Sequence, residues 1–316
     1  MIRFLLRKIF AFLTTIFCVV TLTFFLMKAI PGDPFVDEQA LPKEIHESLR
    51  EHYGLNDPLL KQYGRYLVST FSWDLGPSLK YSGRTVNQLI REGFPVSFLL
   101  GMEALFIAIG VGVFVGAISS TYQHPWIDRG AKLFIMIGIS MPSFACATFL
   151  QYLFCMKFAL FPVARWGSWL HTILPAISLA ILPAAFITRL VRGQMEEVLK
   201  QDFIKVCRAK GLTDFEVMRG HVIKNSLLPL FAYLGQLSAN IFVGSFIVEK
   251  IFSIPGLGQW FVRSVMNRDY TVIMGLTVFY SVLLVSMVLF FDLLSMWLDP
   301  RVRKRTIYHK PVIQKV

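Results

Sequence analysis

The chain has 316 residues, 55 % of them hydrophobic, and a mean hydropathy of +0.57. This composition is typical of a membrane protein and excludes an ordinary soluble globular domain. The formal net charge of +12 raises the alternative of a nucleic-acid-binding protein. The positions of the charges along the chain decide between these alternatives. Cys18, Cys146, Cys155 and Cys207 have no CxxC spacing and no histidines at metal-ligand spacing, so they are interpreted as small apolar residues.

Six stretches without charged side chains are each long enough to cross a membrane, which takes about 20 helical residues. Open sheets are excluded in lipid, and the stretches lack the alternation of barrel strands, so the sequence predicts transmembrane helices. The first stretch is too long for a cleaved signal peptide and is expected to stay in the chain. The six stretches are residues 9–27, 104–127, 133–156, 166–188, 225–248 and 270–291.

The lysines and arginines predict the orientation of these helices. With a cytoplasmic N-terminus, the segments placed in the cytoplasm hold 19 basic and 7 acidic residues, whereas residues 31–97 hold 7 basic and 9 acidic ones. Loops on the cytoplasmic side of a membrane carry the excess of basic residues. We therefore expect both termini in the cytoplasm. Topology alone then accounts for the positive charge, which argues against a nucleic-acid partner.

The most charge-rich segment between the predicted spans covers residues 202–229. Phe203, Val206, Cys207 and Lys210 recur at i, i+3, i+4 and i+7, which predicts an amphipathic helix with an apolar stripe beside a basic face. The charges would be costly in lipid, so this segment is expected to project into water. An amphipathic helix of this kind suits a groove on another protein, while a solvated linker is the alternative.

Local signals divide this segment into two short helices. Gly211 stands where a left-handed residue ends a helix. Thr213 and Glu216 have the spacing of a capping box, in which each side chain bonds to the backbone of the other residue. The sequence therefore predicts a helix-turn-helix projection between the fourth and fifth spans.

These residues resemble a known family. The run Asp-Phe-Ile-Lys-Val-Cys-Arg-Ala-Lys-Gly-Leu at 202–212, followed by Asn-Ser-Leu-Leu-Pro at 225–229, resembles the cytoplasmic loop of permease subunits of ABC importers. Within that family it resembles the peptide/nickel branch, and most closely the first membrane subunit of an oligopeptide or dipeptide importer. One departure is that Lys205-Val206-Cys207 stands where the wider family has an acidic residue followed by two alanines. The other matching runs are Ile-Pro-Gly-Asp-Pro at 30–34, Glu-Lys-Ile-Phe-Ser-Ile-Pro-Gly-Leu-Gly at 249–258, Arg-Asp-Tyr at 268–270 and Asp-Pro-Arg at 299–301.

The resemblance implies a contact with an ATPase subunit through the first helix of the projection. The residues assigned to this ATPase contact are Asp202, Phe203, Ile204, Lys205, Val206, Cys207, Arg208, Ala209, Lys210 and Gly211.

Two further sites are expected in the membrane and at its outer surface. The glycine-punctuated hairpin after the fifth span is a candidate outer gate, its glycines being suited to turns with positive φ, and a structural turn is the alternative. Glu103 lies within an apolar span, and ionisable groups in such positions are functional candidates. The alternative is a carboxylate that reaches the outer surface or bonds a neighbouring helix. Asn240 is the second pathway candidate, with packing inside the bundle as the competing interpretation. The outer gate candidates are Glu249, Pro255, Gly256, Gly258, Arg268 and Asp269.

The expected fold is an all-α integral membrane protein with six transmembrane helices, of the type I ABC importer permease fold. An extracytoplasmic helical segment follows the first helix, with helices near 42–53 and 59–67 that form a platform for a binding protein or a cap on the bundle. The expected divisions are residues 1–95, then a five-helix permease core at 96–300 with a coupling loop at 191–224, then a cytoplasmic tail at 301–316.

The function implied is that of a permease subunit of an ATP-driven, binding-protein-dependent importer of oligopeptides or dipeptides in the bacterial cytoplasmic (inner) membrane. No phosphate-binding Gly-x-x-x-x-Gly-Lys-Ser/Thr and no catalytic motif occurs, so the chain is not expected to be an enzyme or to hold a cofactor. Its expected partners are a second permease subunit, two ATP-binding subunits, an extracytoplasmic substrate-binding protein and the lipid bilayer. The alternatives are import of nickel or another small solute, and an ion-coupled secondary transporter.

Overall fold

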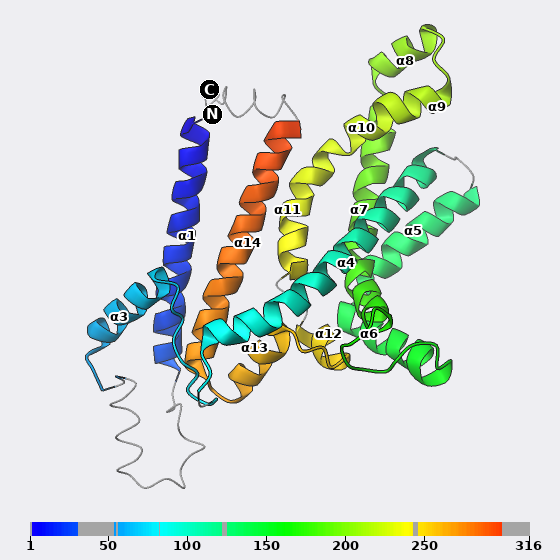
Figure 1. Cartoon of the computed structure of the whole chain (residues 1–316). Coiled ribbons are helices and arrows are strands. Elements are labelled where there is room, and N and C mark those ends of the chain that lie inside the picture. Colours follow the sequence, from blue (N-terminus) through cyan, green and yellow to red (C-terminus); the bar gives the residue numbers. More distant parts are fainter. Residues whose placement is uncertain are drawn as a thin grey trace.

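The computed structural model describes residues 2–30, 54, 56–81, 83–121, 125–242 and 246–298, and every regular element in these ranges is helical. The helix expected near 42–53 and the run at 299–301 lie outside these ranges. Figure 1 shows one end of the molecule formed by α8 and α9 and the opposite end formed by α3, α6, α12 and α13. The helices are α1 (Ile2–Ala29), α3 (Leu59–Phe71), α4 (Val86–Thr121), α5 (Pro125–Ser140), α6 (Ser143–Leu150), α7 (Leu170–Leu199), α8 (Asp202–Ala209), α9 (Asp214–Val217), α10 (Ile223–Ser226), α11 (Leu228–Phe242), α12 (Phe246–Ile251), α13 (Leu257–Met266) and α14 (Tyr270–Leu298).

Helices long and apolar enough to cross a membrane occur in the number that the sequence predicts. In the described ranges α1, α4, α7 and α14 qualify singly, and two bent pairs raise the count to six if each pair is one span. The first pair bends by 106° between Ser140 and Ser143, where Pro142 interrupts the helix, the usual effect of a proline inside a helix. The second pair, from Asp214 to Ile251, bends by 53°.

The boundaries of the second span differ from the prediction of 104–127. Helix α4 already begins at Val86, and Ile127 belongs to α5, across the undescribed residues 122–124. Arg91 and Glu92 lie before the uncharged run but inside the helix, because both are exposed while the opposite side of α4 is buried. The helix also continues through the exposed Pro95. The expected division at 95/96 thus falls inside a continuous helix.

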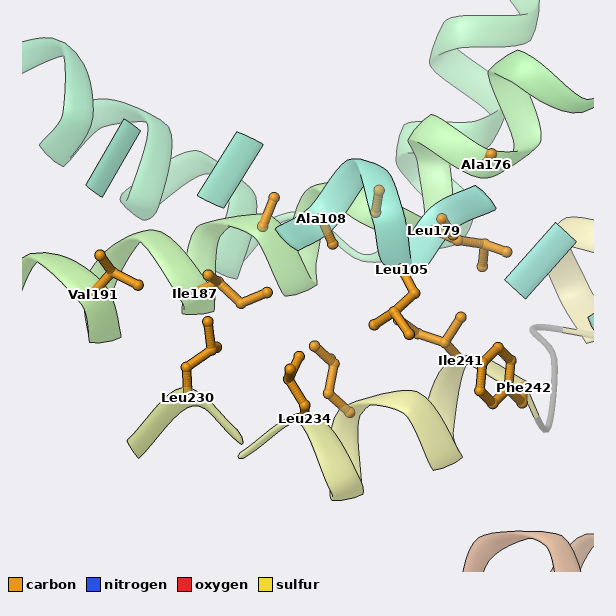
Figure 2. Close-up of a cluster of buried hydrophobic side chains, with 14 of the residues drawn as sticks. Leu105, Ala108, Ala176, Leu179, Ile187, Val191, Leu230, Leu234, Ile241 and Phe242 are labelled. Carbon is orange, nitrogen blue, oxygen red and sulfur yellow. The ribbon is translucent and has the colours of Figure 1, made fainter. Parts of the chain in front are cut away.

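The main apolar core lies between α4, α7 and α11. Figure 2 shows Leu105 and Ala108 of α4, Ile187 of α7 and Leu234 of α11 pointing toward one another. A Cβ atom added to Gly112 would lie 2.6 Å from the Cβ of Ile187, so α4 and α7 approach at a distance that only glycine permits. Such small-residue contacts are how membrane helices gain packing energy without a hydrophobic effect between them.

A second apolar cluster joins α1 and α14 to the end of the molecule that holds α13. Among its buried members are Val20, Leu75, Leu257 and Leu276. At the other end of the same helix pair, Lys8 Nζ lies 2.6 Å from Asp292 Oδ2. Asp292, an acidic residue near the end of α14, is thus paired with Lys8 of α1.

Candidate functional site

The α8–α9 projection (residues 202–217) stands out from the helix bundle, as Figure 1 shows. Ile204, only 1 % exposed, anchors α8 to the core, and Cys207 is half-buried. Phe203 and Val206 are 36 % and 53 % exposed. The predicted apolar stripe is thus divided: Cys207 packs against the core, Phe203 and Val206 face outward, and the buried anchor is a residue outside the predicted stripe.

The remaining residues assigned to the ATPase contact are all exposed. Lys205 Nζ pairs with Asp202 Oδ1 at 2.8 Å, and Arg208 Nη2 pairs with Asp214 Oδ1 at 3.1 Å, which links α8 to α9. These are surface ion pairs and contribute little to stability. The exposed set is Asp202, Lys205, Arg208, Ala209, Lys210 and Gly211.

The turn between α8 and α9 has the predicted geometry. Gly211 has φ = +82°, in the left-handed region that glycine occupies without steric cost. The Thr213 N–H donates to Glu216 Oε2 at 2.8 Å, and the Glu216 N–H donates to Thr213 Oγ1 at 3.4 Å. The capping box is confirmed, and it fixes the direction in which α9 leaves the turn.

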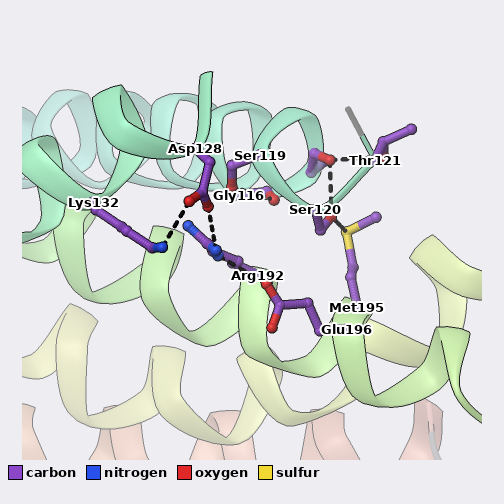
Figure 3. A network of polar contacts seen from close by, with 10 residues as sticks. Gly116, Ser119, Ser120, Thr121, Asp128, Lys132, Arg192, Met195 and Glu196 are labelled. Atoms are coloured by element: carbon purple, nitrogen blue, oxygen red, sulfur yellow. Dashed lines mark hydrogen bonds and ion pairs between the residues drawn. The ribbon is translucent and has the colours of Figure 1, made fainter. Parts of the chain in front are cut away.

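An ion-pair network ties α5 to α7, close to the point where α7 leads into α8 (Figure 3). Arg192 pairs with Asp128, and its Nε lies 2.9 Å from Glu196 Oε1, while Lys132 Nζ lies 2.6 Å from Asp128 Oδ2. The Arg192 side chain is mostly buried, and its Nη1 atom is buried without a hydrogen-bond partner among the described residues. The i, i+4 spacing of Arg192 and Glu196 is visible in the sequence, but no sequence signal identifies Asp128 as their partner.

We expect Asp128→Asn to lower the free energy of unfolding by about 1–3 kcal/mol, because it removes the charge from the hydrogen bonds to a largely buried guanidinium. Thermal unfolding of the purified protein in detergent measures this change. Lys132→Gln is the matched control, since Lys132 is well exposed and its ion pair with the same carboxylate is expected to contribute less than about 1 kcal/mol. Equal destabilisation by both variants would contradict the structural role of Arg192.

The outer gate candidates form two separate clusters at the opposite end of the molecule. In the first, Glu249 of α12 is fully buried. Ser97 Oγ of α4 donates to Glu249 Oε1 at 2.8 Å, and the Gly258 N–H donates to Oε2 at 2.9 Å. Ser97 Oγ also accepts from the Leu257 N–H at 2.9 Å. The carboxylate thus stabilises the start of α13 and joins α4, α12 and α13.

Gly256 and Gly258 of this cluster allow neighbouring parts of the chain to approach closely. They do not have the positive φ that the sequence suggests. Gly256 has φ = −93° and Gly258 lies within α13. A Cβ atom on Gly256 would meet the Glu249 carboxylate, and one on Gly258 would lie 2.6 Å from Phe246 Cα. The expectation of left-handed glycines was wrong here. Glycine is needed at these positions because the Glu249 carboxylate and the Phe246 backbone occupy the space that a Cβ atom would need.

The second cluster surrounds Asp269, which is also fully buried. Ser78 Oγ donates a hydrogen bond to its carboxylate, and the N–H groups of Leu79 and Val272 each lie 3.2 Å from Oδ1. Asp269 therefore caps α14 and fastens the segment that precedes α4. Pro255 and Arg268 are exposed, and neither cluster includes them.

The pathway candidates lie on different helices. Glu103 is half-buried on α4, and Asn240 is exposed on α11, with Gln236 exposed one turn earlier on the same face. Within the described ranges, no hydrogen bond or ion pair joins Glu103 to Asn240, and no group of three or more potential metal ligands occurs. The exposure of Asn240 argues against the alternative in which it packs inside this chain.

The sequence matches two family models that together cover most of the chain. The family described as "Binding-protein-dependent transport system inner membrane component" matches residues 108–304, and the model of its N-terminal part matches residues 1–96. The dipeptide transport system permease protein of Bacillus subtilis is 45 % identical, over 96 % of this chain and 98 % of that protein. The oligopeptide transport system permease protein of Haemophilus influenzae is 38 % identical, over 96 % of this chain and all of that protein.

Solved structures share the fold. An amino acid ABC transporter aligns with a TM-score of 0.53 at 20 % identity, covering 68 % of this chain and 94 % of that chain. A methionine ABC transporter in an inward-facing conformation aligns with a TM-score of 0.56 at 17 % identity, covering 67 % and 97 %. At these identities the likeness establishes the arrangement of helices and nothing finer.

Proposed function

The chain belongs to the family of binding-protein-dependent transport system inner membrane components, and from this we propose that it imports dipeptides or oligopeptides as one permease subunit of a larger complex. The observation that carries the substrate class is the identity of 45 % to a dipeptide permease, over almost the full length of both chains. Membership of an ABC importer implies that other ABC components act with this one. The chain itself is a translocation subunit and not an enzyme, and ATP is bound and hydrolysed on partner subunits.

The proposed complex contains a second permease subunit, two ATP-binding subunits and a binding protein outside the membrane. Both termini and the α8–α9 projection lie in the cytoplasm in this arrangement. Exposed Phe203 and Val206 support docking of α8 in a groove of an ATPase, because an apolar pair on a water-exposed helix needs a partner surface. Closure of the ATPases on ATP would then move α8 and switch the access of the pathway by rigid-body motion.

The α12–α13 end is proposed to close the pathway on the outer side. The buried carboxylates of Glu249 and Asp269 support this role, since they tie α12, α13 and α14 to α4 and to the segment before it. A segment fixed in this way moves with α4 as one body. The two clusters would therefore transmit a motion of the bundle to the outer mouth.

Uptake by proteoliposomes that contain the complete importer tests the substrate class. We expect ATP-dependent accumulation of a labelled tripeptide in the presence of the binding protein, and no accumulation of nickel. Omission of ATP and omission of the binding protein are the two controls. Accumulation of nickel without accumulation of peptide would keep the importer function and overturn the peptide assignment.

A further inference from the structure

A hollow of about 360 Å³ lies between α7 and α11, on a side of α7 that the other described helices leave open. Helix α7 is the most buried of the four single spans, yet Phe186, Arg189 and Gly193 are exposed on this side. A Cβ atom on Gly193 would meet no other atom within 4 Å, so the space in front of α7 is open. The residues that line the hollow are Phe186, Arg189, Leu190, Gly193, Gln194 and Tyr233.

The polar groups of the hollow have no partners in the described part of the chain. Arg189 is exposed, while Gln194 and Tyr233 are half-buried, and none of the three forms a hydrogen bond or ion pair there. Phe186 and Leu190 supply apolar walls. A hollow with apolar walls and a few polar groups in fixed positions is the usual form of a small-molecule site.

Lipid tails are a poor cover for this side of the molecule. Beyond Tyr233 the polar residues continue along α11 to Gln236 and Asn240, at positions i+3 and i+7, and both are exposed. Polar side chains inside a span face other protein or a water-filled cavity, since hydrocarbon cannot satisfy them. The hollow is therefore continuous with a polar stripe that suits a pathway through the membrane.

Arg189 differs from its neighbour Arg192 in being available to a ligand. Arg192 is held by Asp128 and Glu196, whereas no acidic group pairs with Arg189 among the described residues. A second hollow, between α5 and α7, is also lined by Arg189 and by Lys132 and Arg192. Glu196 lines this second hollow too, and Lys132 and Arg192 are paired with Asp128 and Glu196, so Arg189 supplies the positive charge that remains unpaired among the described residues of the two hollows. An unpaired guanidinium favours an anionic group, and it binds a carboxylate through two parallel hydrogen bonds.

We propose that the α7–α11 hollow binds the C-terminal carboxylate of a peptide in transit, with Arg189 as its ion-pair partner. This inference rests on the proposed peptide import. Gln194 and Tyr233 are placed to bond the last peptide group, and Phe186 and Leu190 to contact the last side chain. Every unmodified linear peptide carries this carboxylate, so such a site accepts peptides whatever their sequence.

The first test compares Arg189→Gln with the unmodified chain in proteoliposomes that contain the complete importer. Loss of a charge-assisted contact is expected to lower uptake of a free-acid tripeptide by about ten- to hundredfold. Arg189→Lys is expected to recover part of that loss. Arg129→Gln is the matched control, because Arg129 is a cation of α5 that stacks on Trp126 and lines neither hollow. Uptake by Arg189→Gln within twofold of the unmodified chain would overturn the proposal.

The second test locates the peptide directly and does not depend on its uptake. A photoreactive benzophenone amino acid replaces Phe186, and a labelled tripeptide is added to the complete importer before illumination. We expect the labelled tripeptide to be crosslinked to the chain, and we expect Arg189→Gln to lower this labelling at least fivefold. An unlabelled C-amidated tripeptide should compete poorly with the labelled one. Labelling that is unaffected by Arg189→Gln would overturn the site. Labelling that an added phospholipid abolishes, and that unlabelled peptide does not, would overturn it as well.

Failure of the proposed function and failure of the proposed site give different results. If the unmodified importer accumulates no peptide, the proposed function is wrong and the hollow has no peptide to bind. If the unmodified importer accumulates peptide and Arg189→Gln does so equally well, the function stands and only the site is wrong.

Discussion

Replacement of Gly211 by aspartate is expected to abolish peptide uptake while the protein remains in the membrane in normal amount. Gly211 has φ = +82°, a conformation that costs most residues with a side chain about 1–2 kcal/mol, and asparagine and aspartate less. A Cβ atom at this position would meet no other atom within 4 Å, so the bundle itself is not disturbed. The aspartate also adds a negative charge at the C-terminal end of α8, where the helix dipole disfavours it.

The expected consequence is a changed direction of α8, which carries exposed Phe203 and Val206. Uptake and ATP hydrolysis are measured together in proteoliposomes, and we expect hydrolysis that no longer depends on peptide and binding protein. Gly211→Asn should keep most of the activity, because asparagine tolerates the left-handed region and adds no charge. Gly220→Asp is the matched charge control, since Gly220 is exposed and helical and also has open space around it. Normal coupled uptake by Gly211→Asp would refute the coupling role of this turn.

Replacement of Gly258 by alanine is expected to prevent accumulation of the folded protein. The added Cβ atom would lie 2.6 Å from Phe246 Cα and 2.8 Å from Glu249 Oε2, closer than real Cβ contacts. Helix α13 would have to move away from α12, which breaks the hydrogen bond from the Gly258 N–H to a buried carboxylate. Overpacking and a weakened buried polar group together cost roughly 2–5 kcal/mol.

The amount of monodisperse protein after extraction in detergent, and its thermal unfolding, measure this effect. Gly64→Ala is the control, because Gly64 lies in α3 with no atom near an added Cβ. Glu249→Gln preserves the shape of the buried group and should be far better tolerated than Glu249→Leu, which leaves Ser97 and the start of α13 without an acceptor. A Gly258→Ala protein as stable as the Gly64→Ala protein would contradict the close packing of α12 against α13.

Features that depend on neighbouring residues were predictable from the sequence. The turn at Gly211 and the capping box of Thr213 and Glu216 involve residues at most a few positions apart, so spacing is sufficient to find them. The same holds for the break at Pro142. The sequence could not tell which face of α8 packs against the core, and Ile204 was therefore missed as the anchor.

The clusters at the other end of the molecule depend on contacts between distant residues. Ser97 and Glu249 are 152 positions apart, and Ser78 and Asp269 are 191 positions apart. The sequence identified the carboxylates through the family resemblance but gave no indication of the serines. It also assigned Gly256 and Gly258 to turn geometry, although the tertiary packing around Glu249 is what requires them. Arg189 was counted only as a cation that sets topology, because the hollow in front of it exists only once α7 and α11 are placed.

The pairing of α1 with α14 has a consequence for biosynthesis. Lys8 and Asp292 are separated by 284 positions, so the ribosome delivers them to the membrane at very different times. At a synthesis rate of 5–20 residues per second, α1 waits roughly 15–60 s for the partner against which it packs. Its high mean hydropathy of 2.5 suits a helix that must remain inserted alone during that interval. The Lys8–Asp292 pair can therefore form only after α14 has been synthesised, and truncation within α14 would leave the first helix without its partner.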